Sequence, residues 1–334
     1  MTIKDIAREA GYAVGTVSRV LNNHPDVSET ARRVIMEVVE KNHFRINSNA
    51  KHLKQQSFAA IAIIIKGTKN MLFARLVETL QGLIKEKGYA CLIYYLEEDD
   101  NEVEQALQIC LDRQPMGILF LGSNLEYFRN LFDKVEIPCV LVTNSAKKVN
   151  MPNLSSVSVN DEEAAKMAIE LLVALGHEKI GILGGDLEKS HVARVRFRGC
   201  EQAYIQHNKE FDKETQYEAA RFTVESGYRS MTALIQKNPD ITAVFAMADV
   251  LAIGAIRAVK DLGLRVPEDI SVIGFDGIEM GQYMVPRLTT IKQPDEQIAI
   301  RSVEVMLDCI NGKEASHEIE PFLLMVGEST KERR

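Results

Sequence analysis

The chain has 334 residues, a formal net charge of −7 and 46% hydrophobic residues. These values describe an ordinary soluble protein of two or three domains and exclude disordered and collagen-like chains. The longest apolar run, residues 58–65, is far shorter than the roughly 20 residues of a membrane-spanning helix, and the N-terminus has no signal-peptide pattern. We therefore expect a cytoplasmic protein with no membrane partner. The cysteines, which lack a Cys-x-x-Cys pair, are expected to be reduced core residues: Cys91, Cys110, Cys139, Cys200 and Cys309.

The charge is divided unevenly along the chain. Residues 1–57 hold nine Lys or Arg and six Asp or Glu, a balance of +3, which leaves −10 for the remaining residues. A small basic segment joined to a larger acidic one suggests that the basic segment meets a polyanion such as DNA while the rest binds something else. Charge alone favours a merely solvated basic surface equally well.

Two short helices are predicted at the N-terminus. Thr2 can cap the first, whose apolar residues share one face, and Gly11 can end it. The second is expected over Val14–Leu21 with its valines at 17 and 20 turned inward. Two helices joined by a turn of this length have the geometry of a helix-turn-helix, in which the second helix enters the DNA major groove.

A third helix is expected after Ser28, which follows the turn at 24–26 and can act as the N-cap. Its inward residues are expected to be Val34, Ile35, Val38 and Val39. The helix is expected to end near Asn42, because asparagine tolerates a left-handed conformation. Three helices of this kind can close one small core.

The N-terminal segment resembles the head of the lactose-repressor/galactose-repressor (LacI/GalR) family of bacterial transcriptional regulators. The resemblance rests on Thr2-Ile3-Lys4-Asp5-Ile6-Ala7 and on Gly15-Thr16-Val17-Ser18-Arg19-Val20-Leu21-Asn22, and it continues through Val27-Ser28, Asn47, Ala50 and Leu53. Such a dense motif occurs by chance far less often than a lone glycine pattern. A three-helix bundle without DNA binding is the competing interpretation.

The resemblance implies which residues contact DNA. Base contacts fall to Val14, Gly15 and Arg19, and Arg19 is the strongest because a guanidinium can donate two hydrogen bonds to O6 and N7 of guanine. Phosphate contacts fall to Thr16, Ser18 and Asn22. The full set implied by the resemblance is Val14, Gly15, Thr16, Ser18, Arg19, Asn22, Ser28, Asn47, Ala50 and Leu53.

The segment 47–54 is similar to the hinge helix of the family, with Leu53 as the side chain that enters the minor groove and kinks the duplex. An ordinary linker leucine is the alternative. The sequence departs from the family pattern at Ala13, where serine usually caps the second helix, and the loss weakens that cap by about 1 kcal/mol. Gly15 lowers the helix propensity further, Phe44 replaces the usual tyrosine and Ile46 replaces the usual proline. The operator sequence therefore cannot be copied from a relative.

From residue 59 the pattern changes to short β-branched runs that alternate with amphipathic stretches, which indicates βαβ units and parallel sheets. The expected strands are 59–65, 90–95, 117–121, 139–142, 179–183, 242–246 and 271–275. A helix is expected over 73–87. Two Rossmann-like halves follow, with junctions at 156–160 and 289–293 and a third crossing near Pro321.

Three segments of this region, 175–180, 263–276 and 288–293, resemble the periplasmic-binding-protein-like effector domain of the same family. The resemblance implies a small-molecule effector, a sugar or sugar derivative, bound between two lobes at the carboxyl ends of strands. The effector-binding residues that it implies are Leu72, Phe73, Thr143, Asn144, Arg196, Ala248, Asp276 and Gln293.

Arg196 and Asp276 suit this role chemically, because a fork-shaped donor and a carboxylate acceptor can grip vicinal hydroxyls. A salt bridge between the lobes is the alternative for this pair. Ala248 stands where many relatives have an asparagine, so one polar contact with the ligand is lost. Arg194, Arg196 and Arg198 alternate with apolar residues, and an anionic ligand is a further option, although helix-surface charges are the commoner explanation.

The sequence gives no support to an enzyme. No Gly-x-Gly-x-x-Gly follows a strand, no Gly-x-x-x-x-Gly-Lys-Ser/Thr occurs, and 181–186 misses the dinucleotide spacing. The acidic run 161–163 fits a helix N-terminus, and His177 after Gly176 fits a helix end better than a catalytic role. We expect no enzymatic activity, no cofactor and no metal site.

Together these patterns predict an α/β protein with a helix-turn-helix head, a hinge helix and a two-lobed effector domain built on parallel Rossmann-like sheets. The expected boundaries are 1–46 for the head, 47–57 for the hinge and 58–334 for the effector-binding and dimerisation domain, with a first lobe of about 58–159 and 291–320 and a second of about 160–290 and 321–330. The resemblance implies a homodimeric repressor on a pseudo-palindromic DNA operator, and the absence of a C-terminal leucine heptad favours a dimer over a tetramer. A solute-binding protein without DNA function is the alternative class.

Overall fold

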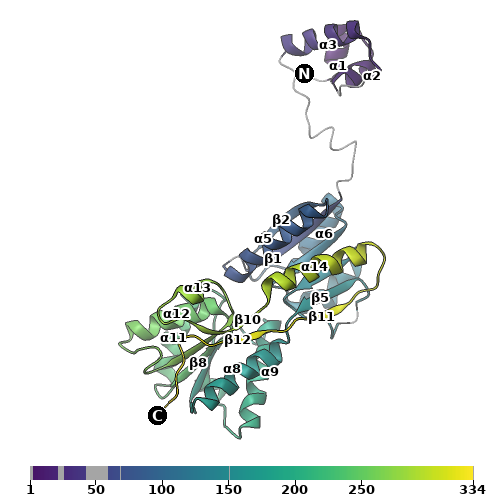
Figure 1. The fold of residues 1–334 in the computed structure, drawn as a ribbon. Helices are drawn as coiled ribbons and strands as arrows, with labels where there is room; N and C mark the ends of the chain where they lie inside the picture. Colours follow the sequence, from purple (N-terminus) through teal and green to yellow (C-terminus); the bar gives the residue numbers. More distant parts are fainter. Residues whose placement is uncertain (1–2, 22–25, 43–58, 68, 150, 334) are drawn as a thin grey trace. The chain divides into compact units, whose positions relative to one another are not determined.

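The computed structural model describes residues 3–21, 26–42, 59–67, 69–149 and 151–333. The chain divides into two compact units, Met1–Ser57 and Phe58–Arg334, and Figure 1 labels the elements of both. No helix in these described ranges is long and apolar enough to cross a membrane.

The first unit contains the three predicted helices, α1 (Ile3–Ala10), α2 (Val14–Leu21) and α3 (Glu29–Lys41). Gly11 ends α1 with a φ of +70°, and the amide of Tyr12 bonds back to the carbonyl of Ala7. The Ser28 side chain caps α3 by accepting from the amide of Ala31, as predicted. The predicted cap at Thr2 lies outside the described residues.

The core of this unit is made by Ile6, Val17, Val20 and Ile35, which are almost fully buried, and Ala31 is buried with them. Two predictions for α3 are wrong. Val34 does not join the core, because Ala31 and Ile35 occupy the inward face. The C-cap Asn42 has a φ of −99°, so it is not left-handed; its side chain instead bonds to Val38 and to Glu9 on α1.

The second unit contains two six-stranded sheets. The first lobe holds the sheet ordered β11-β5-β4-β3-β1-β2, and all its pairings are parallel. Its strands are β1 (Ala60–Lys66), β2 (Ala90–Leu96), β3 (Gly117–Leu121), β4 (Cys139–Val142), β5 (Leu154–Ser158) and β11 (His317–Ile319). Its helices are α5 (Met71–Glu86), α6 (Glu102–Arg113), α7 (Leu125–Leu131) and α14 (Asp295–Ile310), with a short 3-10 turn at Phe132–Lys134.

Strand β1 explains why this sheet is buried on both faces. Ile61, Ile63 and Ile65 pack with α5 and α14, while Ala62 and Ile64 pack with α6 and α7. A strand covered on both faces needs a continuous apolar run instead of an alternating one, and that is the pattern the sequence displays.

The second lobe holds the sheet ordered β12-β10-β9-β8-β6-β7, in which only β12 runs antiparallel to its neighbour. Its strands are β6 (Ile180–Gly184), β7 (Tyr217–Ala219), β8 (Ala243–Ala246), β9 (Ser271–Asp276), β10 (Thr289–Lys292) and β12 (Leu323–Met325). Its helices are α8 (Asp161–Ala174), α9 (His191–Gln206), α10 (Lys213–Gln216), α11 (Val224–Lys237), α12 (Asp249–Asp261) and α13 (Met280–Tyr283). The pair α8–α9 and the pair α11–α12 lie on either side of the strands (Figure 1).

All seven predicted strands are present, with ends within one residue of the prediction. The chain passes between the lobes after β5, after β10 and after β11, at the predicted junctions. Two of these junctions contain the ends of strands that we did not predict, β5 and β10. The prediction that residues 291 and 292 belong to the first lobe is wrong. Because β10 extends to Lys292 in the second sheet, both residues belong to the second lobe.

Candidate functional site

The DNA-reading surface predicted from the sequence lies on one side of α2. Val17 and Val20 bury the inner side of the helix, whereas Val14, Gly15 and Arg19 are exposed. The guanidinium of Arg19 has no hydrogen-bond or ion-pair partner among the described residues, so its donors are available to an external acceptor.

The other predicted DNA contacts divide into two groups. Thr16 and Ser18 are half-buried on α2, and Ser28 is exposed but uses its hydroxyl as the N-cap of α3. The remaining four lie outside the described residues: Asn22, Asn47, Ala50 and Leu53. The hinge helix predicted over 47–57 lies outside them as well.

The second lobe brings three predicted effector residues together at the carboxyl ends of its strands. Arg196, on α9, is 5% exposed and stacks its guanidinium 3.6 Å from the ring centroid of Phe275. Its Nη2 lies 4.0 Å from Oδ1 of Asp276, at the end of β9. The side-chain amide of Gln293 donates to the same Oδ1 at 2.8 Å.

The main partner of Arg196 was not predicted. Its Nε donates to Oδ1 of Asp161, the first residue of α8, at 2.8 Å, and a terminal nitrogen donates to the carbonyl of Met247 at the end of β8. All of these residues belong to the second lobe, so the alternative of a salt bridge between the lobes is wrong for Arg196 and Asp276. The guanidinium of Arg196, on α9, instead contacts the start of α8 and the carboxyl ends of β8 and β9.

The carboxyl group of Asp276 is electrostatically unusual. Burial raises its pKa to about 6, against the opposing effects of Arg196, of the hydrogen bond from Gln293 and of the nearby Asn70 side chain. Its Oδ2 and the Oε1 of Gln293 are buried without a hydrogen-bond partner among the described residues. Buried acceptors rarely stay unpaired, so these two oxygens point to a ligand that donates hydrogen bonds.

Two further predicted residues lie in the first lobe. Thr143 and Asn144 follow β4, both are buried, and the Asn144 amide donates to the carbonyl of Ser123 at 2.7 Å. Thr143 has a φ of +74° and Asp276 a φ of +111°. Residues other than glycine seldom adopt this conformation, and such strain is concentrated at functional sites.

The last three predicted effector residues lie apart from this hydrogen-bonded group. Leu72, on α5, is buried in the core, and Phe73 of the same helix packs its ring against Gly122, where a Cβ would lie only 2.9 Å from the ring. Ala248 precedes α12 and is buried, with no side-chain cap. None of them shares a hydrogen bond or a ring contact with Arg196, Asp276 or Gln293 within the described ranges.

Polar contacts also join the two lobes. The Asn124 amide on the first lobe donates to the carbonyl of Lys189 on the second at 2.9 Å, and Arg194 pairs with Glu126 at 3.2 Å. Arg221 reaches Asp99 in the same way. Arg194 is therefore committed to a protein carboxylate, and Arg198 pairs with Glu162, so neither is a free cation for an anionic ligand.

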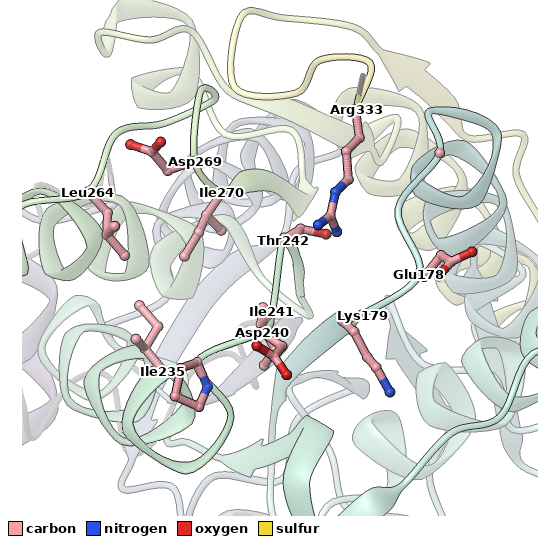
Figure 2. A pocket seen from close by; sticks show the side chains of 12 residues that line it. Glu178, Lys179, Ile235, Asp240, Ile241, Thr242, Leu264, Asp269, Ile270 and Arg333 are labelled. Atoms are coloured by element: carbon pink, nitrogen blue, oxygen red, sulfur yellow. The ribbon is translucent and has the colours of Figure 1, made fainter.

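A separate cavity of about 640 Å³ lies elsewhere in the second lobe (Figure 2). It is lined by Lys179, Thr242 and Ile270, which immediately precede β6, β8 and β9, and by Arg333 near the C-terminus. Ligands of parallel sheets bind at the carboxyl ends of strands, whereas this cavity lies at the amino ends. None of the predicted effector residues lines it.

His177 holds the C-terminal segment in place. Its backbone amide bonds to the carbonyl of Leu172 and so caps α8, as predicted. Its buried ring bonds to Thr242, Ser271 and the carbonyl of Lys331, a role that the sequence did not reveal. Burial lowers the pKa of His177, which keeps the ring neutral.

The chain matches two family models. Residues 2–47 match the family described as bacterial regulatory proteins, lacI family, and residues 169–330 match the periplasmic binding protein-like domain. It is 33% identical to the HTH-type transcriptional regulator MalR of Clostridium butyricum, over 93% of each chain. It is also 31% identical to the HTH-type transcriptional repressor PurR of Aliivibrio fischeri, with 96% of this chain and 94% of PurR covered.

Solved structures share the fold. The Lac repressor dimer bound to operator superposes with a TM-score of 0.74 at 24% identity, over 99% of both chains. The complex of the transcriptional regulator CelR with cellobiose gives 0.72 at 24% identity, over 98% of this chain and 99% of CelR. With a helix-turn-helix head, two parallel-sheet lobes and relatives of this similarity over nearly the whole length, the chain belongs to the LacI family of DNA-binding transcriptional regulators.

Proposed function

We propose that the protein is a homodimeric repressor whose affinity for a pseudo-palindromic operator is set by a neutral, hydroxyl-rich effector. The observation that carries this proposal is the pair of buried, unpaired oxygens on Asp276 and Gln293 beside the fixed guanidinium of Arg196. Vicinal hydroxyls can donate to both oxygens. The names of two solved relatives agree with this chemistry, since CelR is in complex with cellobiose and an Enterococcus faecium regulator is bound to ribose.

On the DNA side, we propose that Val14, Gly15 and Arg19 read base edges while Thr16, Ser18 and Asn22 contact phosphates. The support is the exposure of the first three residues on α2 and the absence of an internal partner for Arg19 in the described part of the chain. Ser28, Asn47, Ala50 and Leu53 complete the proposed contact set. Thr143 and Asn144 are proposed to complete the effector site from the first lobe.

The proposed mechanism needs two subunits. A head with a balance of only +3 holds DNA weakly, so pairing two heads on one operator supplies useful affinity. The Lac repressor is named as a dimer on its operator. An effector that binds one arrangement of the lobes more tightly than the other shifts the population of the dimer and hence its operator affinity. We propose a cytoplasmic regulator without catalytic activity; the DNA-binding head argues against a solute-binding protein.

A thermal-shift panel tests the effector site directly, because a ligand that binds only the folded protein raises its melting temperature. The panel contains cellobiose, ribose, their phosphorylated counterparts and nucleobases. A neutral sugar is expected to raise the melting temperature of the unmodified protein and not that of Asp276→Ala. An equal rise in both proteins would contradict the proposed site, and a rise with phosphorylated sugars alone would contradict the proposed ligand class.

A further inference from the structure

We propose that Asp249 is a positioning residue that holds the Asp276 carboxyl in its effector-binding orientation. This inference rests on the proposed function of the Asp276 site. Asp249 is the first residue of α12, has no exposed surface and was not predicted as a functional residue. It is placed to act through Asp276 and not on the ligand itself.

The contacts of Asp249 join three separate elements. Its Oδ2 accepts from the amide of Ile278 at 2.8 Å, in the loop after β9, and the amide of Gly277 lies close enough to the same carboxyl to lower its pKa. Its Oδ1 accepts from the hydroxyl of Thr290 on β10 at 2.6 Å. One carboxyl group therefore links the start of α12 to the loop that follows Asp276 and to the strand that leads to Gln293.

The backbone at Asp276 needs such a link. Asp276 and Gly277 have φ values of +111° and +72°, so two consecutive residues are in the left-handed region, where an aspartate is seldom found. Two consecutive amide groups that converge on one acceptor form a concave nest for a carboxyl group. With Asp249 as that acceptor, the turn is held in place and Oδ2 of Asp276 remains unpaired.

The surrounding residues leave space for this carboxyl. A Cβ at Gly274 of β9 would lie 2.1 Å from Oδ1 of Asp249, so the strand carries a glycine at the point where the carboxyl packs. On the other side of the turn, the backbone amide of Gln293 donates to the backbone carbonyl of Asp276 at 3.1 Å. Thr290 and Gln293 thus hold β10 against the same turn from both ends.

The shape of the Asp249 side chain suggests a conservative substitution. Burial raises its pKa well above the ordinary value, and the nearby Asp276 carboxyl raises it further. Asparagine has the same shape, and its carbonyl can accept from the amide of Ile278. Its NH2 can donate to the Thr290 oxygen once that hydroxyl turns to the carbonyl of Ile291, which lies 3.4 Å away. Alanine removes every one of these bonds.

The test compares Asp249→Ala, Asp249→Asn and a control, Ser230→Ala, in the full-length protein. Ser230 is buried in the same lobe and donates a single hydrogen bond to the carbonyl of Ala219, away from β9 and β10. Hydrogen exchange of the amides at 277–278 is measured without ligand, with the amides of β6 as an internal reference. Calorimetric titration with cellobiose, or with the neutral sugar that gives the largest thermal shift, measures effector affinity.

We expect Asp249→Ala to raise exchange at 277–278 at least tenfold while β6 is unchanged, and to weaken sugar binding at least tenfold. Asp249→Asn and Ser230→Ala are expected to stay within threefold of the unmodified protein in both measurements. Unchanged exchange in Asp249→Ala, an equal rise throughout the lobe, or no rescue by asparagine would overturn the positioning role. If no sugar binds the unmodified protein, the proposed effector site fails, and the exchange measurement still decides whether Asp249 holds the turn.

Discussion

The buried charges around Arg196 determine what the effector site can offer a ligand. Arg196 faces the carboxyl groups of Asp161 and Asp276, and burial raises the pKa of both acids while the guanidinium lowers it. Its Nε and one terminal nitrogen are already used by Asp161 and Met247. Its Nη2 lies 4.0 Å from Oδ1 of Asp276 and makes no hydrogen bond among the described residues. The site therefore offers one donor group beside two unpaired acceptor oxygens, which suits a ligand with several hydroxyl groups.

Effector affinity is expected to depend on pH through Asp276. The ionised carboxylate is the better acceptor for hydroxyl donors, and its pKa is raised to about 6. Affinity should be constant above about pH 7 and fall below pH 6, by at most tenfold per pH unit for a single proton. Calorimetric titration between pH 5 and pH 8 measures this dependence.

The matched control is Asp276→Asn, which should bind more weakly than the unmodified protein and without this pH dependence. Loss of folded protein through this group cannot explain weaker binding at low pH. The pKa of Asp276 is raised in the folded state, so its protonation stabilises the folded protein as the pH falls from 6 toward 4. A pH profile shared by both proteins would assign the titration to another residue.

Arg19→Ala tests the reading of bases by α2. Losing a bidentate contact to guanine should cost about 1–3 kcal/mol of operator affinity and relax the preference at one position in each half-site. Lys4→Ala, which removes a charge from α1 instead, should weaken binding to all sequences alike. Anisotropy titrations against a set of single-base operator variants distinguish the two outcomes, and an unchanged preference in Arg19→Ala would refute the base contact.

The sequence predicted part of the proposed effector site and missed the residues that support it. Arg196, Asp276 and Gln293 could be proposed because the family resemblance reaches each of them, and the structure brings them into contact. Asp161 and Asp249 were missed because their partners are 35 and 29 residues away in the chain. Aspartates at helix starts have a local explanation in the helix dipole, and nothing in the sequence shows that they also bind across the fold.

At the level of elements, composition decided which strands could be predicted. The strands made mostly of aliphatic and aromatic residues were placed within one residue. The strand Leu154–Ser158 was missed because three of its five residues are serines, although every one of them is buried. Its polar side chains are accommodated by tertiary partners, since Ser155 lies 3.4 Å from the sulfur of Cys309 and Ser156 lies 2.9 Å from His317.

His177 provides a test of how the C-terminal segment is held on the second sheet. Replacing it by alanine removes bonds of 3.0, 3.1 and 3.2 Å to Thr242, Ser271 and the carbonyl of Lys331. We expect a loss of about 2–4 kcal/mol in urea unfolding, because buried polar partners are left unpaired. Trypsin should also cleave faster after Lys331.

His207→Ala is the matched control, because His207 is exposed at the end of α9. It should leave both the urea midpoint and the cleavage rate unchanged. If His177→Ala behaved in the same way, the histidine would have no part in anchoring the segment.

At the scale of the whole molecule, the uneven charge follows the division of the chain into a DNA-binding unit and a unit with two sheets. The first unit, Met1–Ser57, has a balance of +3 and carries the helix-turn-helix, while the acidic remainder carries the two sheets. Acidic lobes repel DNA, so the basic head is the part of the chain that meets the operator. The proposed hinge segment between the helix-turn-helix and the lobes includes Leu53.

Leu53→Ala tests the proposed wedge in that segment. An apolar side chain between base steps kinks the duplex, so its removal should reduce DNA bending while effector affinity stays unchanged. Circular-permutation gel shifts measure the bend, and titration with the sugar measures effector affinity. Normal bending by the variant would refute the wedge, whereas loss of effector binding would indicate damage to the lobes.

The central claim is that this chain is a dimeric, sequence-specific DNA-binding regulator. Selection of bound duplexes from a random-sequence pool by the full-length protein tests it most directly, because two heads related by a two-fold axis require two related half-sites. We expect enrichment of one two-fold-symmetric sequence whose affinity for the protein changes when the effector is added. Recovery of sequences without symmetry, or no enrichment above the starting pool, would contradict it.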